Sequence, residues 1–259
     1  MRNKFYHLEL SHISDNDKYI IFLGDSYTWG QGLYLNHWIE NKPEIFEHFY
    51  NTTNGFDTHL SWVQQEPFFG KIENEIKNNL SFTNIVAKKL NRNCYKSINN
   101  GGKNSVNLDF LKKFNQHNFG EKNVIVIFQF TTIGREDIHL TEEEANKLIR
   151  NNKIVDNIFK DKTSTLFDAI DNKLLNLKNE LGWEYYYMDW LGEFYDFMPE
   201  KFITFGERKI PNISLLTNLY HNKILYKDRI FYDYHLNSKG NIFVADSIVN
   251  HIQQNLENW

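Results

Sequence analysis

Three residues of this chain could combine for nucleophilic chemistry. Ser26 follows the apolar run Tyr19–Leu23 and closes the tripeptide Gly24-Asp25-Ser26. Near the other end of the chain, Asp233 precedes His235 by two residues. A serine hydroxyl is a weak nucleophile unless a base takes its proton, and that base needs an acceptor to orient it. We therefore predict Ser26 as the nucleophile, His235 as the general base and Asp233 as the orienting carboxylate.

The spacing of Asp233 and His235 suits these roles. In an extended segment, side chains at positions i and i+2 lie on the same face. The carboxylate can then accept a hydrogen bond from Nδ1–H of His235 and leave Nε2 for Ser26. The tetrahedral intermediate also needs donors for its oxyanion, and the backbone N–H groups of Ser26 and Gly102 are candidates because glycine allows close backbone approach. The side-chain donors that could complete the oxyanion hole are Thr131, Asn104 and Gln129.

Alternating strands and helices would position these residues. The run Val124–Phe130 is apolar throughout apart from Gln129, which is typical of a strand buried on both faces. Apolar side chains three and four residues apart predict the helices. The predicted strands are Tyr19–Leu23, Cys94–Ile98, Val124–Phe130, Trp183–Met188 and a short fifth at Ile230–Tyr232. The predicted helices span about 82–90 with Ser81 as N-cap, 106–114, 166–181 with Gly182 as the C′ residue, and 242–256, and Thr141–Glu144 fits a capping box.

This alternation predicts an α/β fold, a three-layer α/β/α sandwich with a mostly parallel sheet. The carboxyl ends of parallel strands lie on one edge of the sheet, and ligands bind there. Ser26, Gly102 and Thr131 each follow a predicted strand, and so do Asp233 and His235. We therefore expect all five to converge on one edge.

Composition limits the class of protein. The 259 residues, 41% of them hydrophobic, suit one domain over residues 1–259. An irregular, aromatic-rich insertion at about 33–80 could form a lid or pack over the sheet edge. The net charge of −4 argues against binding a phosphate backbone. Cys94 is the one cysteine, so it cannot form an intramolecular disulfide, and we expect it to be buried.

Targeting and metal signals are also informative. Residues 1–18 lack the apolar segment of a secretory signal, and no apolar run is long enough to span a bilayer, so we expect a cytoplasmic protein. His37, His48 and His59 lack metal-ligand spacing. We expect no metal or cofactor, a small-molecule or carbohydrate ester as the partner, and no nucleic acid.

The pattern resembles the SGNH, or GDSL-type, hydrolase family. In that family the nucleophile lies in a Gly-Asp-Ser motif after the first strand, as Ser26 does here. A second block supplies an oxyanion glycine, and Asn99–Asn104 resembles it through Gly102. A last block carries aspartate and histidine before the C-terminal helix, as Asp233–Gly240 does. The resemblance spans roughly residues 18–255 and implies a flavodoxin-like, SGNH-type fold.

Two blocks differ from the family pattern. The third block, usually Gly-x-Asn-Asp, corresponds to Phe128–Thr132, with Thr131 in the place of the asparagine that donates to the oxyanion. The last block reads Asp-x-His instead of Asp-x-x-His, as in related groups that act on carbohydrate acyl groups, so Asp233 keeps its role.

Residues and resemblance together predict a serine esterase, a carboxylic ester hydrolase that works through an acyl-enzyme. An O-acetyl group on a carbohydrate is one candidate substrate. Two alternatives remain open. The same triad could serve an O-acyltransferase, with a sugar hydroxyl in place of water. The fold could also serve a non-catalytic carbohydrate- or protein-binding module, which the altered third block favours.

Overall fold

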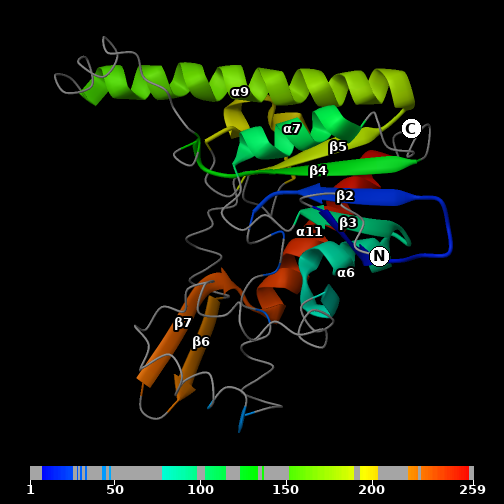
Figure 1. Cartoon of the computed structure of the whole chain (residues 1–259), viewed down its shortest axis with the longest axis vertical. Coiled ribbons are helices and arrows are strands. Elements are labelled where there is room, and N and C mark those ends of the chain that lie inside the picture. The colour runs from blue at the N-terminus through cyan, green and yellow to red at the C-terminus, as the bar shows by residue number, and fades with distance from the viewer. Residues whose placement is uncertain are drawn as a thin grey trace.

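The computed structural model describes most of the expected α/β core. The described residues are 8–25, 28, 30, 33, 43–44, 47, 78–97, 103–114, 123–133, 136, 152–189, 193–203, 221–226 and 229–256. Most of the predicted insertion at about 33–80 and the capping box at Thr141–Glu144 lie outside these residues. Within them, strands alternate with helices around a five-stranded sheet (Figure 1).

The sheet has the order β1-β3-β2-β4-β5. Strands β2 to β5 are parallel to one another, and β1 pairs antiparallel with β3 at the edge. Four predicted strands are confirmed, and for two of them the first and last residues agree with the prediction. The edge strand β1 was not predicted. The strands are β1 (Leu8–His12), β2 (Tyr19–Leu23), β3 (Asn93–Ser97), β4 (Val124–Phe130) and β5 (Glu184–Asp189).

Strand β2 lies at the centre of the sheet, with β3 on one side and β4 on the other. The chain therefore moves outward in one direction from β2 to β3, then crosses back and moves outward in the other direction through β4 and β5. In open α/β sheets, ligands bind at a reversal of this kind, outside the carboxyl ends of the strands. The residues that follow β2 and β4 are therefore the first place to look for a site.

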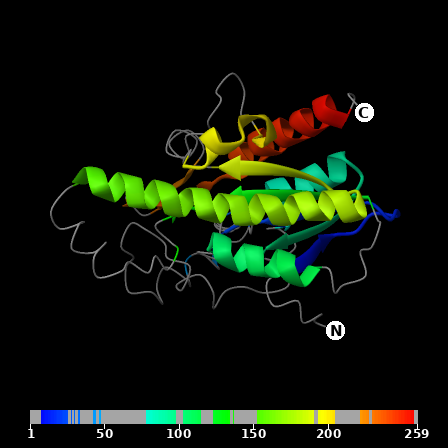
Figure 2. The same cartoon turned by 90° about the horizontal axis from the view of Figure 1, so that it is seen from above.

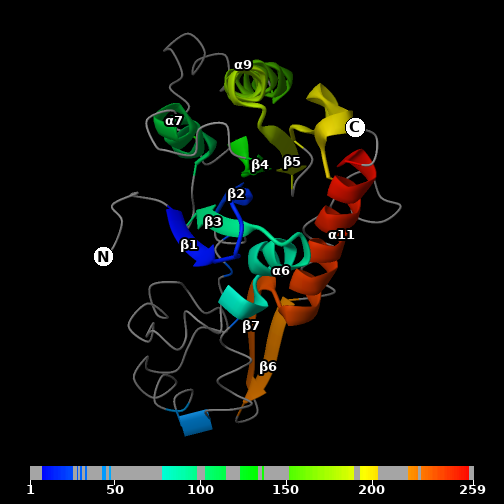
Figure 3. The ribbon, with the colours of Figure 1, turned by 90° about the vertical axis from the view of Figure 1, so that its right-hand side faces the viewer.

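Helices cover both faces of the sheet (Figures 1 and 3). Helices α7 and α9 pack on one face, and α6 and α11 pack on the other. Helix α9 is longer than the strands that it covers, and its first turns extend past them (Figure 2). The helices are α6 (Phe82–Lys89), α7 (Asn104–Phe114), α9 (Asn152–Leu181) and α11 (Ser238–Leu256), with short 3-10 helices η3 (Tyr195–Phe197) and η4 (Pro199–Lys201).

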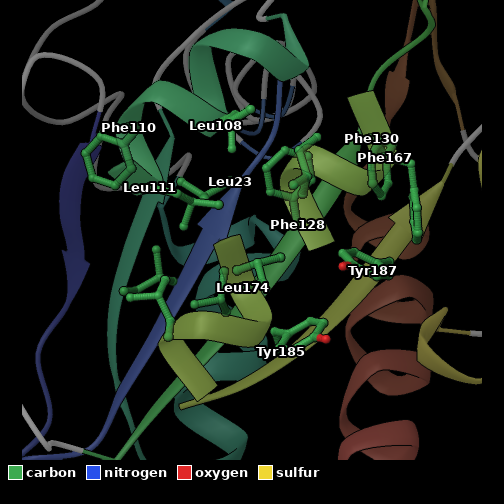
Figure 4. Packing of buried hydrophobic residues seen from close by; sticks show 14 of the residues in the cluster. Leu23, Leu108, Phe110, Leu111, Phe128, Phe130, Phe167, Leu174, Tyr185 and Tyr187 are labelled. Carbon is green, nitrogen blue, oxygen red and sulfur yellow. The ribbon is translucent and has the colours of Figure 1, made fainter. Parts of the chain in front are cut away.

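The two faces carry separate hydrophobic clusters because side chains alternate along each strand. On β2, Ile21 and Leu23 belong to the cluster under α7 and α9, whereas Ile20 and Phe22 belong to the cluster under α6 and α11. Figure 4 shows the first cluster, in which aromatic rings of β4, β5 and α9 gather around Phe130. Burial on both faces explains why the central strands are apolar throughout most of their length.

The predicted fifth strand at Ile230–Tyr232 is wrong as a member of this sheet. These residues belong to β7 (Arg229–Leu236), which pairs antiparallel with β6 (His221–Tyr226) in a separate two-stranded sheet (Figure 1). The partner strand immediately precedes β7 in the chain, so the backbone groups pair locally. Beside β5, a single parallel bridge joins Tyr187 to Phe202 instead.

The predicted helix ends at Ser81 and Gly182 are confirmed in position, whereas α9 begins at Asn152 instead of about 166 and α11 begins at Ser238 instead of about 242. Gly182 has a φ of 67° and donates its N–H to the carbonyl of Lys178, as a C′ residue does. Ser81 is the N-cap of α6, but its hydroxyl makes no capping bond, and Asn241 of α11 accepts the N–H of Phe82 instead. Cys94 is fully buried, as expected. Among the described residues, no helix is both long and apolar enough to cross a membrane.

Candidate functional site

The predicted site residues differ in how far the structure describes them. Ser26 and Gly102 lie outside the described residues. Thr131 follows β4, and Asn104 is the first residue of α7. Asp233 and His235 lie within β7 itself, not after a strand of the main sheet as predicted. The geometry around position 26 is therefore given by Gly24, Asp25 and Thr28 and by the residues that contact them.

The turn after β2 is held by one buried glutamine. Gln129 of β4 donates from Nε2 to Oδ1 of Asp25 at 2.7 Å and accepts at Oε1 a hydrogen bond from the Thr28 hydroxyl. All three side chains are at least 97% buried. One amide group thus fixes the residues on both sides of position 26. We call this arrangement, made of Gln129, Asp25 and Thr28, the Gln129 bridge.

Gly24 is required here for reasons of space. A Cβ atom at this position would lie 2.7 Å from Oε1 of Gln129 and closer still to the hydroxyl of Thr28. The Gly24 carbonyl accepts hydrogen bonds from Oγ of Ser97 at 3.1 Å and from Nδ2 of Asn107 at 3.4 Å. Strands β3 and β4 and helix α7 therefore all contact the turn, which leaves it little freedom.

Thr131 presents a hydroxyl at the same edge of the sheet. Its backbone is paired with Asn104, whose Oδ1 accepts the Thr131 N–H at 2.8 Å and whose Nδ2 donates to the Thr131 carbonyl at 2.9 Å. The Thr131 hydroxyl is buried and has no hydrogen-bond partner in the described part of the chain. A buried hydroxyl without a partner is costly, and such groups are often functional. The amide of Asn104 is largely engaged, so Thr131 is the better-placed donor of the two.

Carboxylates fix the two segments next to Thr131. Glu136 accepts the backbone N–H groups of Asn104 and Ser105, which lie at the start of α7, where the helix dipole favours negative charge. Glu193 accepts hydrogen bonds from the Thr132 hydroxyl at 2.9 Å and from the N–H of Ile133 at 2.8 Å. Sequence reasoning missed these capping roles, because each joins segments that are not neighbours in the chain.

The segment that carries His235 contains a β-bulge. Asp233 pairs with Asn222 and Leu236 pairs with His221, so Tyr234 and His235 have no counterparts on β6. Bulges redirect side chains and are frequent next to active sites. The bulge also interrupts the regular alternation on which the expected shared face of Asp233 and His235 depends.

The residues after His235 are tightly anchored. Leu236 is buried in the cluster under α6 and α11, and Asn237 caps α11 by accepting the N–H of Gly240 at 3.0 Å. Asn241, which is 2% exposed, donates from Nδ2 to the carbonyls of Leu236 and Asn237, each at 3.0 Å, and accepts the N–H of Phe82 at 2.9 Å. The half-buried His235 therefore precedes a rigid junction between two helices.

A second group of titratable side chains lies on β5 and α11, between the sheet and the helix. The rings of Tyr186 and His251 meet edge to face, 5.3 Å apart, and Nε2 of His251 is buried without a partner among the described residues. Burial lowers the pKa of His251, and the charge of Lys201 lowers it further. In the described part of the chain, no group of three or more His, Cys, Asp or Glu side chains could hold a metal ion.

No protein-family model matches this sequence, and no curated protein sequence matches it at a significant level. One matching solved structure is that of a carbohydrate esterase whose active site displays divergent catalytic and non-catalytic binding functions. The two chains are 11% identical and superpose with a TM-score of 0.38, over 94% of this chain and 67% of the other. A likeness at this level supports no inference about activity.

Proposed function

We propose that this protein is a serine-dependent ester hydrolase of the SGNH type, built on a three-layer α/β/α sandwich. The observation that carries the proposal is the reversal point of the sheet. There the turn after β2 is held by the Gln129 bridge, and β4 is followed by Thr131, whose buried hydroxyl has no hydrogen-bond partner among the described residues. Open α/β sheets bind ligands at such a reversal point.

Thr131 directly follows β4, and β4 pairs in parallel with β2, which ends at Leu23 just before the Gly-Asp-Ser tripeptide. A hydroxyl donor at that place suits an oxyanion that forms on a carbonyl attacked by Ser26.

In the proposed reaction, the Ser26 hydroxyl attacks the ester carbonyl while His235 takes its proton. The alcohol leaves with that proton. Water then attacks the acyl-enzyme while His235 takes a proton from it, and His235 returns this proton to Ser26 as the acid is released. Asp233 orients His235 and stabilises its charged form. The backbone N–H groups of Ser26 and Gly102 and the hydroxyl of Thr131 hold the oxyanion, with Asn104 as a further donor or as the support of Thr131. An O-acetylated carbohydrate is the proposed class of substrate.

The test is covalent labelling of Ser26. Wild-type protein is incubated with a fluorophosphonate probe and, separately, with a short-chain p-nitrophenyl ester, and the labelled peptide is identified by mass spectrometry. We expect no labelling in Ser26→Ala and a loss of about 10³-fold or more in esterase rate in His235→Ala. Ser247→Ala is the matched control, because Ser247 hydrogen-bonds only within α11, and it should behave as wild type.

Thr131→Val tests the oxyanion role separately, since valine keeps the shape of threonine and removes the hydroxyl. Loss of one oxyanion donor lowers kcat by about 10²- to 10³-fold. A folded wild-type protein that the probe does not label would refute the proposal and favour a binding module on the same fold. Transfer of the acyl group to an added sugar in excess of hydrolysis would instead identify an acyltransferase.

A further inference from the structure

We infer that Gln129 is a positioning residue that supports the reactivity of Ser26 by holding Asp25 and Thr28. This inference rests on the proposed function. Gln129 contacts the residue immediately before Ser26 and the residue two positions after it, from the neighbouring strand β4. It therefore acts through the turn and not on the substrate.

The polarity of the amide is determined by its neighbours. Oδ1 of Asp25 accepts a hydrogen bond at 2.7 Å, so the NH2 group of Gln129 must face Asp25. Its carbonyl oxygen then faces Thr28, whose hydroxyl must act as the donor. Gln129 is only 1% exposed, so water cannot easily reach Asp25 or Thr28 to replace a hydrogen bond that Gln129 no longer makes. Asp25 and Thr28 keep these two hydrogen bonds as long as position 129 offers a donor to Asp25 and an acceptor to Thr28.

Two substitutions separate these properties. Gln129→Met keeps nearly the same length and volume but offers neither hydrogen bond. Gln129→Glu in its neutral form can donate its O–H to Asp25 and accept from Thr28, whereas in its ionised form it places a second carboxylate against Asp25. Like charges in a buried site repel each other, so the glutamic acid introduced at position 129 should take up a proton at low pH. The function of Gln129→Glu should therefore depend on pH in a way that wild type does not share.

The experiment compares the rate of fluorophosphonate labelling at Ser26 in each variant with that of wild type at the same pH, at about pH 5 and about pH 8. A misplacement of about 1 Å at a reacting group can lower the rate about 10²-fold. We expect a loss of that order in Gln129→Met at both pH values, with kcat for a p-nitrophenyl ester lowered and KM nearly unchanged. Gln129→Glu should show the same loss at the higher pH and recover most of it at the lower pH.

Gln254→Met is the matched control, because Gln254 is exposed on α11, and it should label as wild type does. Melting curves show whether each variant is folded. If Gln129→Met does not fold, Gln129→Glu at the higher pH and Thr28→Val take its place. Labelling at the wild-type rate in these folded variants, with no pH effect specific to Gln129→Glu, would overturn the inference. A wild-type protein that does not label would instead refute the proposed function itself.

Discussion

Replacing Asn241 by alanine should destabilise the junction that follows His235. The side chain of Asn241 joins the start of α6, the end of β7 and the start of α11, through the backbone groups of Phe82, Leu236 and Asn237. The substitution removes all three hydrogen bonds at once. It also leaves the first N–H of α6 buried without its acceptor, since the Ser81 hydroxyl makes no capping bond.

The magnitude follows from these contacts. Each of the three hydrogen bonds contributes about 1 kcal/mol net, and the better helix propensity of alanine returns about 0.5 kcal/mol. The expected loss in the free energy of unfolding is therefore about 2–3 kcal/mol, and unpaired buried groups would increase it. For a chain of this length, that loss corresponds to a fall in Tm of about 4–8 °C.

The assay is chemical denaturation with urea, followed by circular dichroism, together with a thermal melt. Asn255→Ala is the matched control, because Asn255 lies on the same helix and makes only a local bond to the carbonyl of His251. That variant should lose no more than about 0.5 kcal/mol. If Asn241→Ala proved as stable as Asn255→Ala, the reasoning that Asn241 joins the three elements would be refuted.

The further predictions concern two glycines and a histidine. Gly24→Ala should lower the free energy of unfolding by about 1–3 kcal/mol, because the added Cβ would overlap Gln129 and Thr28. Gly182→Ala should lower it by about 1 kcal/mol, because this position has open space but a φ of 67°. Equal and negligible effects of the two substitutions in urea titrations would contradict this explanation. The folded protein lowers the pKa of His251 below its ordinary value of 6.5, so the unfolded state binds more protons and stability falls as the pH drops below that value. His251→Phe should weaken this fall in Tm between about pH 7.5 and about pH 5.5, whereas an identical pH dependence in both proteins would exclude His251 as a cause.

The main sheet could be predicted from sequence because burial on both faces leaves a simple pattern. The apolar pattern predicted buried strands at Tyr19–Leu23 and Val124–Phe130. The structure has strands with the same first and last residues. Helix periodicity likewise located the helices, but α9 begins at Asn152, fourteen residues before the predicted start at Leu166. Strand β1 escaped notice because an edge strand with exposed positions, such as Leu10, lacks that continuous apolar pattern.

The contacts within the site could not be predicted in the same way. Gln129 interrupts an apolar strand, which marks it as unusual, but nothing local indicates that its partners are Asp25 and Thr28. The role of Asn241 at the start of α6 is equally distant in sequence. The bulge at Tyr234–His235 depends on the register with β6, and a single strand carries no information on register. Polar contacts between segments that are remote in sequence leave no periodic pattern of residue types, so they cannot be predicted from periodicity.

The strand order also has a consequence for synthesis on the ribosome. Asp25 emerges early, but its partner Gln129 follows 104 residues later, and β2 gains its second neighbour only with β4. Until that length of chain has been made, the turn at Gly24 lacks the Gln129 bridge, although Ser97 and Asn107 can already donate to the Gly24 carbonyl. Because non-local pairings of this kind form slowly, the proposed nucleophile would acquire its final geometry late in folding. A nascent chain that ends before β4 would therefore carry the Gly-Asp-Ser tripeptide without the site.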